Sequence, residues 1–366
     1  MRRLYRRLGG PGTVLLAFVL TRLLAVVATH AGARFMTPQK RADWVWVPDS
    51  DLRVLPRPPA LLAPLIRWDA PYYLALAKEG YPRPVPGEPV FHLGFLPLYP
   101  LAVRAVAGVG GNYFWAAFLV SNACALAAAL LLLGAGSLSR RADGVRVALL
   151  FLASPGAHFF SYAYSEALFA AALAAALWAL RRGFLPLAAL GGAAASATRS
   201  PGVAAALAIV AHAPARLRNW IAGAASLGGL AAFMAFSHQR YGDALAFIHI
   251  QGYHRRHLSL SGPLKALFAF DADPDYYLVA LLGLYVAVRM IRRTPAWVWL
   301  TAWFLLLLPL ATGTMQALIR YQATNLPLLC GVPALCRGRR FWAVLAGSAA
   351  LMAFEAFLWG KGIGHF

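Results

Sequence analysis

Asp69 is the residue whose type and surroundings are best suited to chemistry. It lies in the segment RWDAPYYLALAKEGY at positions 67–81, among aromatic residues and directly before a short apolar run. A carboxylate held close to a membrane surface can act as a general base and take the proton of an acceptor hydroxyl. The structural alternative is a helix cap, in which the carboxylate accepts hydrogen bonds from backbone N–H groups of the first turn.

Glu166 is a second acid, and it follows Tyr164 and Ser165 at the start of an apolar segment. An acid in the first turn of a helix complements the helix dipole, so one interpretation is purely structural. The other is functional, because a glutamate at this place can hydrogen-bond sugar hydroxyls or orient a cationic partner. The sequence leaves both interpretations open.

Two arginines, Arg199 and Arg320, lie at the ends of segments that otherwise consist of apolar and small residues. A charge at membrane depth is costly unless it is paired, so such residues point to function. Arginine suits a phosphate group, since its planar donors form charge-assisted and often bidentate hydrogen bonds. Anchoring to lipid headgroups by snorkelling is the alternative.

A polar run at 251–257 adds further candidates, which are Gln251, His254, Arg255, Arg256 and His257. The two histidines have a spacing that metal ligands use, but a third ligand is not evident, and we expect no metal here. Contact with a phosphate or a lipid headgroup is the preferred interpretation of this run.

The elements that must position these residues are apolar along the whole chain. Of the 366 residues, 60% are hydrophobic and 13% are charged, which is unusual for a soluble domain. Apolar stretches of roughly 15–22 residues recur, and this is the length that an α-helix needs to cross a bilayer. We expect a single integral membrane domain over 1–366, all-α, with about 11 transmembrane or half-spanning helices. Their expected ranges are 13–30, 113–137, 145–160, 165–180, 184–198, 200–213, 220–238, 275–290, 296–312, 319–336 and 341–359.

Clusters of arginine lie in every second gap between these stretches, as the positive-inside rule requires. The clusters are at 2–7, 140–146, 181–182, 216–218, 289–293 and 337–340, and Asp143 is the only acid among them. We therefore expect a cytoplasmic N-terminus and a retained first helix rather than a cleaved signal peptide. Asp69, Arg199 and Arg320 then lie on the extracytoplasmic side.

Two long segments are expected on that outer side, at 31–111 and 239–274. The first contains short amphipathic stretches that suit the membrane interface, near 61–66, 72–77 and 98–106. A different kind of break is expected in the apolar block 184–213, where Thr198-Arg199-Ser200-Pro201-Gly202 must end one helix and begin another. Arg199 would then lie at the outer tip of two short helices.

The net charge of +21 does not indicate nucleic acid, because the arginines form short clusters between apolar runs rather than one polar face. We expect membrane lipids as partners instead. The cysteines Cys124, Cys330 and Cys336 all lie in apolar stretches without a CxxC pair, which favours structural thiols over a disulfide or a metal site.

Several short motifs follow one another in a specific order. They are Trp68-Asp69 with Tyr73, Ala77 and Gly80-Tyr81, then FLPLYP at 95–100, Ser154-Pro155, Phe159-Phe160, YSEALF at 164–169, Ala197-Thr198-Arg199, Tyr241-Gly242-Asp243, Gln251, Met315 and Arg320-Tyr321. Together they resemble the PIG-V family of mannosyltransferases, within the GT-C superfamily of multi-span glycosyltransferases. The resemblance covers roughly 13–330, with Ala70 where glycine is usual and Tyr72 where tryptophan is common.

The resemblance implies a GT-C-type helical bundle whose amphipathic first outer loop supplies the acid. Asp69 would be the base of an inverting sugar transfer, of mannose in this family, from a polyprenyl-phosphate donor to a glycan, lipid or protein acceptor. Arg199 and Arg320 would stabilise the leaving phosphate, with Arg255 or Arg256 as lesser candidates. Neither a cofactor nor a metal is expected. The full set of expected substrate contacts is Arg67, Trp68, Tyr73, Tyr164, Glu166, Arg199, Gln251, His254, Arg255, Arg256, Arg320 and Tyr321.

Two other functions stay open at this stage. A lipid-linked-sugar flippase or a small-molecule transporter would use broken helices such as the one at 198–202, although such proteins usually keep their polar groups near the bilayer midplane. A noncatalytic membrane scaffold would need no outer carboxylate among cations. The arginine-rich, alanine-rich and lysine-poor composition indicates GC-rich coding and a bacterial plasma membrane.

Overall fold

The computed structural model describes residues 2–37, 57–84, 89–134, 143–253 and 256–363. The described residues form helices and connecting turns, and no strand occurs among them, which confirms the expected all-helical class. The α-helices are α1 (Arg2–Arg34), α3 (Ala70–Glu79), α4 (Leu98–Gly110), α5 (Tyr113–Leu132), α6 (Gly144–Leu152), α7 (Glu166–Arg181), α8 (Leu185–Thr198), α9 (Ala204–His212), α10 (Leu217–Ser226), α11 (Gly228–Tyr241), α12 (Ala246–Tyr253), α13 (Gly262–Phe268), α14 (Pro274–Met290), α15 (Ala296–Leu310), α16 (Leu318–Ala323), α17 (Leu326–Leu335) and α18 (Arg339–Lys361). Short 3₁₀ helices are η2 (Ala63–Leu65), η3 (Phe91–Gly94), η5 (Pro155–Ser161) and η6 (Ser200–Val203).

Three of these helices are long and apolar enough to cross a membrane, at Gly9–Arg34, Tyr113–Leu132 and Arg339–Lys361. The number rises to five if the bent pairs α6–η5 and α10–α11 each count as one span. The chain is therefore a membrane protein, but the expected count of about 11 spans is not confirmed. Many of the apolar stretches fold as helices of 10–17 residues instead.

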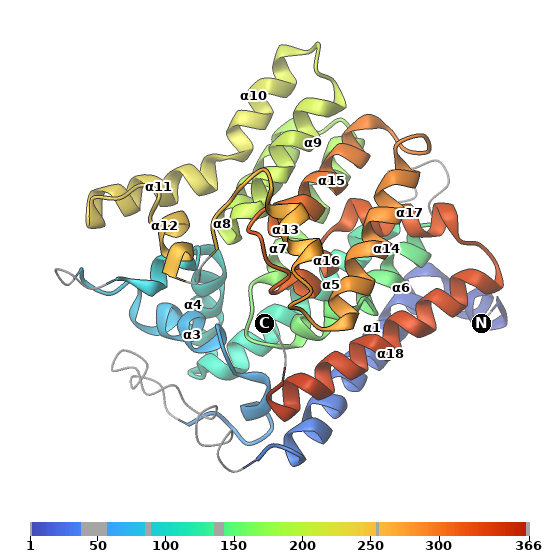
Figure 1. Ribbon diagram of the computed structural model, residues 1–366, viewed down its shortest axis with the longest axis horizontal. Coiled ribbons are helices and arrows are strands. Elements are labelled where there is room, and N and C mark those ends of the chain that lie inside the picture. Colours follow the sequence, from blue (N-terminus) through green and yellow to red (C-terminus); the bar gives the residue numbers. More distant parts are fainter. Residues whose placement is uncertain (1, 38–56, 85–88, 135–142, 254–255, 364–366) are drawn as a thin grey trace.

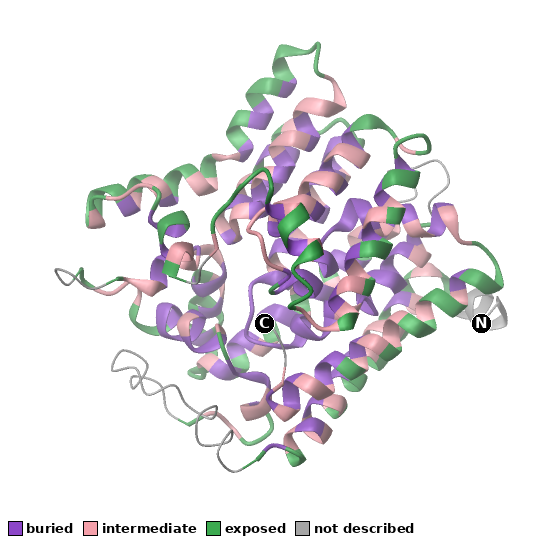
Figure 2. Cartoon of the chain, viewed as in Figure 1, coloured by how far each residue is buried: buried purple, intermediate pink, exposed green. Residues whose placement is uncertain are grey.

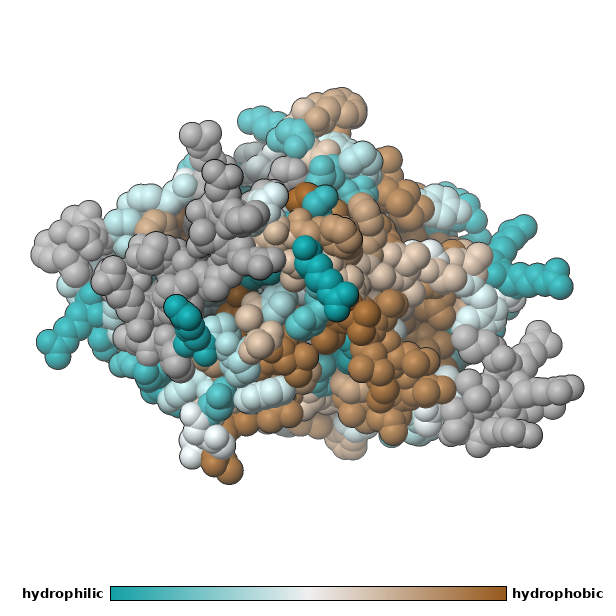
Figure 3. Space-filling model, turned by 90° about the horizontal axis from the view of Figure 1, so that it is seen from below, coloured by the Kyte–Doolittle hydropathy of each residue, from teal (hydrophilic) through white to brown (hydrophobic). Residues whose placement is uncertain are grey.

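The first and last helices, α1 and α18, lie side by side along one edge of the molecule (Figure 1). Glycines permit their close approach, because a Cβ at Gly32 would overlap the carbonyl oxygen of Phe357 and one at Gly360 would overlap that of Thr29. The outer face of α1 exposes leucines and valines, including Leu20, Leu23 and Val27. From below, the molecule shows a broad apolar surface in its middle and right part (Figure 3).

The prediction of one continuous helix over 145–160 is wrong. The chain ends α6 at Leu152, bends by 74°, and continues from Pro155 as η5. The guanidinium of Arg22, from the middle of α1, fills the bend: its Nη1 donates to the carbonyl of Ala157 and its Nη2 to that of Leu152, at 2.8 Å. Arg22, which was not among the candidates from the sequence, thus satisfies two carbonyls that the bend leaves open.

The break expected at 198–202 is confirmed. Helix α8 ends at Thr198, Arg199 is extended, and η6 leads into α9. Gly202 is required where the chain turns back, because a Cβ there would overlap the backbone of Ala195 and Ser196. The hairpin packs against α7, which is buried on most of its surface (Figure 2).

Two further ranges differ from expectation. The single helix expected over 319–336 is divided into α16 and α17, because Asn325 caps α17 and Pro327 fits the first turn of a new helix. The helix expected over 220–238 is a pair, α10 and α11, bent by 45°. Of the short stretches expected at the outer membrane interface, 72–77 lies within α3 and 98–106 within α4, whereas 61–66 contains only the 3₁₀ turn η2.

Candidate active site

Asp69 lies directly before α3, at the position of a helix cap, but its carboxylate does not cap the helix. Its Oδ2 instead accepts a hydrogen bond from Nη1 of Arg320, at 2.8 Å. The side chain of Asp69 is 37% exposed, while that of Arg320 is 7% exposed. The capping alternative is therefore wrong for the Asp69 side chain. Its partly exposed carboxylate is instead fixed by an ion pair with the buried guanidinium of Arg320.

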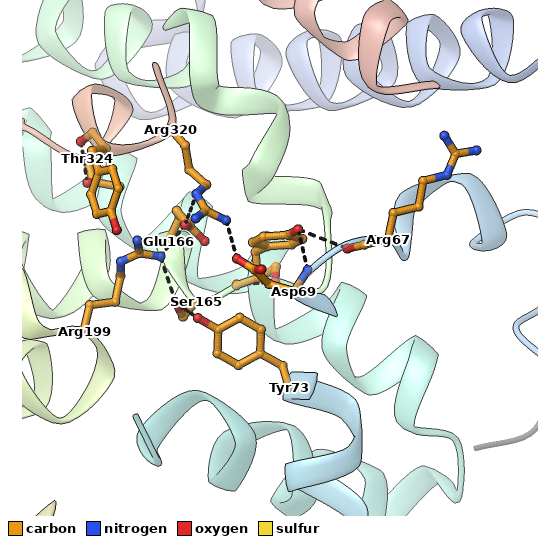
Figure 4. Close-up of polar contacts among 11 residues, drawn as sticks. Arg67, Asp69, Tyr73, Ser165, Glu166, Arg199, Arg320 and Thr324 are labelled. Carbon is orange, nitrogen blue, oxygen red and sulfur yellow. Dashed lines mark hydrogen bonds and ion pairs between the residues drawn. The ribbon is translucent and has the colours of Figure 1, made fainter. Parts of the chain in front are cut away.

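Glu166 lies between two arginines from different segments (Figure 4). Its Oε1 forms an ion pair with Nη1 of Arg199 and lies 3.3 Å from Nε of Arg320. Glu166 is 1% exposed, and its Oε2 has no hydrogen-bond partner among the described residues. Since the two carboxylates of Asp69 and Glu166 face two guanidiniums, the buried cluster is balanced in charge.

The carboxylates of this cluster stabilise the charged form of its arginines. Burial disfavours the charged form of Arg320, but the carboxylates of Glu166 and Asp69 outweigh it and hold the pKa of the guanidinium well above its usual value. The ring of Tyr164 lies under the same guanidinium, with its centroid 5.3 Å from Cζ. Among the described residues, Nη2 of Arg199 and Nη2 of Arg320 have no hydrogen-bond partner.

Tyr73, from α3, joins this cluster through Ser165. The two hydroxyl groups are hydrogen-bonded at 2.7 Å, and Nη1 of Arg199 donates to Ser165 Oγ at 3.2 Å. Ser165 lies at the cap position of α7, yet its side chain forms no cap hydrogen bond. Burial raises the pKa of Tyr73, so its hydroxyl stays neutral and can act as donor or acceptor.

Tyr164 fixes the backbone around Asp69. Its hydroxyl accepts a hydrogen bond from the Asp69 N–H, at 3.1 Å, and donates one to the Arg67 carbonyl, at 3.0 Å. The guanidinium of Arg67 reaches the end of α18, where Nη1 donates to the carbonyls of Trp359 and Gly360 at 2.7 and 2.9 Å. Arg67 thus has a positioning contact, and Trp359 is a contributor that the sequence analysis missed.

Tyr321 lies on the other side of the arginines, with Cζ of Arg199 4.8 Å from its ring centroid. Burial raises the pKa of its hydroxyl, but the positive charges of Arg199, Arg320 and Arg256 outweigh this, and the net pKa lies below the usual value. Arg256 itself donates from Nε to Oε1 of Gln316 at 3.1 Å, at an exposed position. The region around Tyr321 is therefore electropositive.

The remaining candidates lie apart from this cluster or outside the described residues. Gln251 lies on α12 close to Gly94 of η3, so it is part of the contact between the two long segments that were expected on the outer side. His254 and Arg255 fall outside the described residues. Trp68, between Arg67 and Asp69, is 39% exposed. Within the described residues, no group of three or more His, Cys, Asp or Glu side chains could hold a metal ion.

The sequence carries a signal for the structural role of Arg22 but none for that of Trp359. Arg22 is a lone charge in an apolar stretch, which is costly in a membrane and could have marked it as paired. Trp359 carried no such signal, because a tryptophan near the end of an apolar helix is ordinary.

A family model described as Mannosyltransferase (PIG-V) matches residues 14–215, more than half of the chain. The matched range includes Asp69, Glu166 and Arg199, while Arg320 and the helices from α10 onward lie outside it. The resemblance seen in the motifs is thereby confirmed. No curated protein matches the chain.

Proposed function

The chain belongs to the PIG-V family of mannosyltransferases, and on that premise we propose that it transfers mannose from a polyprenyl-phosphate donor, with inversion, to an extracytoplasmic acceptor. A GT-C-type mechanism of this kind needs a base for the acceptor hydroxyl and cations for the leaving phosphate. The observation that supports it most is the convergence of Asp69, Glu166, Arg199 and Arg320 from four distant parts of the chain (Figure 4).

Asp69 is the base in this proposal. Arg320 occupies Oδ2, whereas Oδ1 has no hydrogen-bond partner among the described residues and belongs to a half-exposed side chain. An acceptor hydroxyl that donates to Oδ1 attacks the anomeric carbon of the mannosyl group. The new C–O bond forms as the bond to the phosphate oxygen breaks, the proton passes to Asp69, and polyprenyl phosphate leaves with the bonding electron pair.

The leaving phosphate is stabilised on the Tyr321 side of the cluster. Nη2 of Arg199 and Nη2 of Arg320 remain available as donors, and Arg256 adds an exposed positive charge to the same region. Phosphate oxygens match the planar donor pattern of guanidinium groups. The electropositive surroundings of the Tyr321 hydroxyl support an anion subsite at this place.

Glu166 acts as a positioning residue rather than as a second base. It is almost fully buried and its Oε1 serves both arginines, so it fixes the distance between the guanidinium that holds Asp69 and the one that lies over Tyr321. Preorganised charges of this kind lower the barrier because they need no rearrangement during the reaction.

The test is to incubate membranes that contain the chain with labelled polyprenyl-phosphate-mannose and to identify the product by mass spectrometry. We expect a mannosylated acceptor whose new linkage has the anomeric configuration opposite to that of the donor. A product with the donor's configuration contradicts the inverting mechanism. Transport of the intact labelled lipid across the membrane, without any new glycoside, would instead support the flippase, which the bent helix pairs also suit.

A further inference from the structure

Trp68 has a backbone conformation that is unfavourable for its residue type. Its φ is +54°, in the left-handed region, and among the described residues only Phe270 and Ala317 share this among non-glycine residues. A residue with a Cβ meets its own carbonyl group in this region, and glycine would adopt the same φ at little cost. Strained backbone of this kind persists where its surroundings fix it, and it is frequent at functional sites.

The neighbours of Trp68 explain how the strained turn is held. A single hydroxyl group, that of Tyr164, bridges the Arg67 carbonyl before Trp68 and the Asp69 N–H after it. The Arg67 side chain is fixed by the carbonyls of Trp359 and Gly360, and the Trp359 indole donates to the carbonyl of Pro64 at 2.9 Å. Contacts with the end of α18 thus stabilise the turn, and α18 lies outside the range that the family model matches.

The exposure of the two adjacent side chains points to a ligand. Trp68 is 39% exposed and Asp69 is 37% exposed, so a large flat ring and the carboxylate both reach the surface within one residue of each other. The faces of pyranose rings carry C–H groups that pack well on the electron-rich face of an indole. A position where glycine is the unstrained choice instead holds the largest aromatic side chain.

We propose that the exposed face of Trp68 is the platform on which the pyranose ring of the acceptor stacks while its hydroxyl donates to Oδ1 of Asp69. The acceptor is therefore a saccharide, free or lipid-linked, rather than a protein without sugar. The assignment to the acceptor follows because the base must touch the acceptor hydroxyl, and Trp68 is its direct neighbour. This inference rests on the proposed transferase function.

The first test measures transfer from polyprenyl-phosphate-mannose to octyl α-mannoside as the probe acceptor, with the purified full chain. Trp68→Leu keeps an apolar side chain but removes the flat ring, and we expect the acceptor KM to rise about fivefold to tenfold. The donor KM and kcat should change less than twofold. Trp68→Phe keeps a smaller ring and should fall between Trp68→Leu and the wild type, which guards against misfolding of one variant.

The matched control is Trp115→Leu, because Trp115 lies near the start of α5 and is 38% exposed, almost the same as Trp68. If both leucine variants raise the acceptor KM equally, Trp68 serves only as an interfacial anchor and the inference is wrong. It is also wrong if Trp68→Leu changes the donor KM alone, or if an active wild-type enzyme yields only mannosylated protein that carried no sugar before.

The second test does not require turnover, so it separates this inference from the proposed function. The chain is labelled with 5-fluorotryptophan, and the ¹⁹F signal of Trp68 is identified by its loss in Trp68→Phe. Methyl α-mannoside should shift that signal saturably, while glycerol should not, and the Trp115 signal should stay in place. A wild type that transfers no mannose refutes the proposed function. A Trp68 signal that methyl α-mannoside leaves unmoved, or that moves only with mannosyl phosphate, refutes the acceptor platform.

Discussion

Arg22 and Arg320 are both buried guanidinium groups in an apolar protein, but their partners differ in kind. Arg22 donates to the carbonyls of Leu152 and Ala157 at the bend between α6 and η5, and no carboxylate pairs with it among the described residues. Arg320 pairs with the carboxylates of Asp69 and Glu166. Arg22 therefore stabilises the backbone at a helix bend, while Arg320 forms ion pairs with two carboxylates.

The difference separates a buried charge with a structural role from one to which we assign a role in the proposed reaction. Backbone carbonyls accept hydrogen bonds from both terminal nitrogens of Arg22, and a carbonyl cannot take up a proton, so this region contributes stability. The Arg320 region leaves one carboxylate, that of Asp69, half exposed and its Oδ1 without a partner among the described residues. A buried cation next to an accessible acid is an arrangement that a reaction can use.

The largest expected effect is that of Asp69→Asn. Asparagine can still accept a hydrogen bond from Arg320 but cannot take a proton, so we expect transfer from the labelled donor to fall about 10²–10⁴-fold. The thermal midpoint should fall less than in Glu166→Gln, since the Asp69 side chain is partly solvated and Arg320 keeps Glu166 as a partner. Asp143→Asn is the control, because Asp143 caps α6 and asparagine caps equally well. Near-normal turnover in Asp69→Asn would show that the Arg320 region has no catalytic acid.

Glu166→Gln should have the next largest effect, and mainly on stability. It leaves Arg199 and Arg320 without their shared buried carboxylate, and breaking a buried ion pair costs about 3 kcal/mol or more. Denaturation in detergent measures this loss. Adding Arg199→Met to Glu166→Gln removes the surplus charge and should recover part of the stability. If the double variant is no more stable than Glu166→Gln, the charge balance of the cluster is not what stabilises it.

Replacing each of the two buried arginines by lysine tests directly whether Arg22 and Arg320 have different roles. Arg320→Lys cannot reach Asp69 and Glu166 together, and a displaced Asp69 should lower kcat by about 10²-fold. Arg22→Lys should lower the thermal midpoint, because a carbonyl at the bend loses its donor, while kcat of the folded fraction stays close to that of the wild type. Equal losses of kcat in both variants would show that the bend at α6–η5 also controls the site.

The smallest effect is expected for an exposed ion pair, that of Asp243 with His249 at 2.7 Å. Burial raises the pKa of the Asp243 carboxyl, but the hydrogen bonds from His249 and from the Leu245 N–H, together with the charge of His249, outweigh it, and the net pKa lies below the usual value. A lowered folded-state pKa gives stability that is present above the unfolded-state value near pH 4 and is lost as the pH falls further. The wild type should therefore lose less than about 1 kcal/mol of unfolding free energy between pH 6 and pH 3 through this group. Asp243→Asn should remove this pH-dependent loss and nothing else, which thermal melts over the same pH range measure.

The fold was predictable where local signals are strong. The Pro201-Gly202 pair marked the break after α8, and the apolar stretches marked the long helices α1, α5 and α18. The bends at 153–154 and at 324–325 were not predicted, because the apolar stretches on either side of each were interpreted as one helix. Local signals for both breaks are present, since Ser154 is followed by Pro155 and Asn325 lies two residues before Pro327. What supports the first bend is Arg22, a residue more than a hundred positions away in the chain.

The sequence by itself determined the helical class, the membrane character and the candidate acid and arginines, because hydropathy and residue chemistry are local properties. The tertiary structure alone decided which charges meet. Asp69 and Arg320 are 251 positions apart, and Glu166 is shared by two arginines from separate segments. No short-range rule sets such pairings, since they depend on how α3, α7, η6 and α16 pack together, and packing is a property of the whole chain.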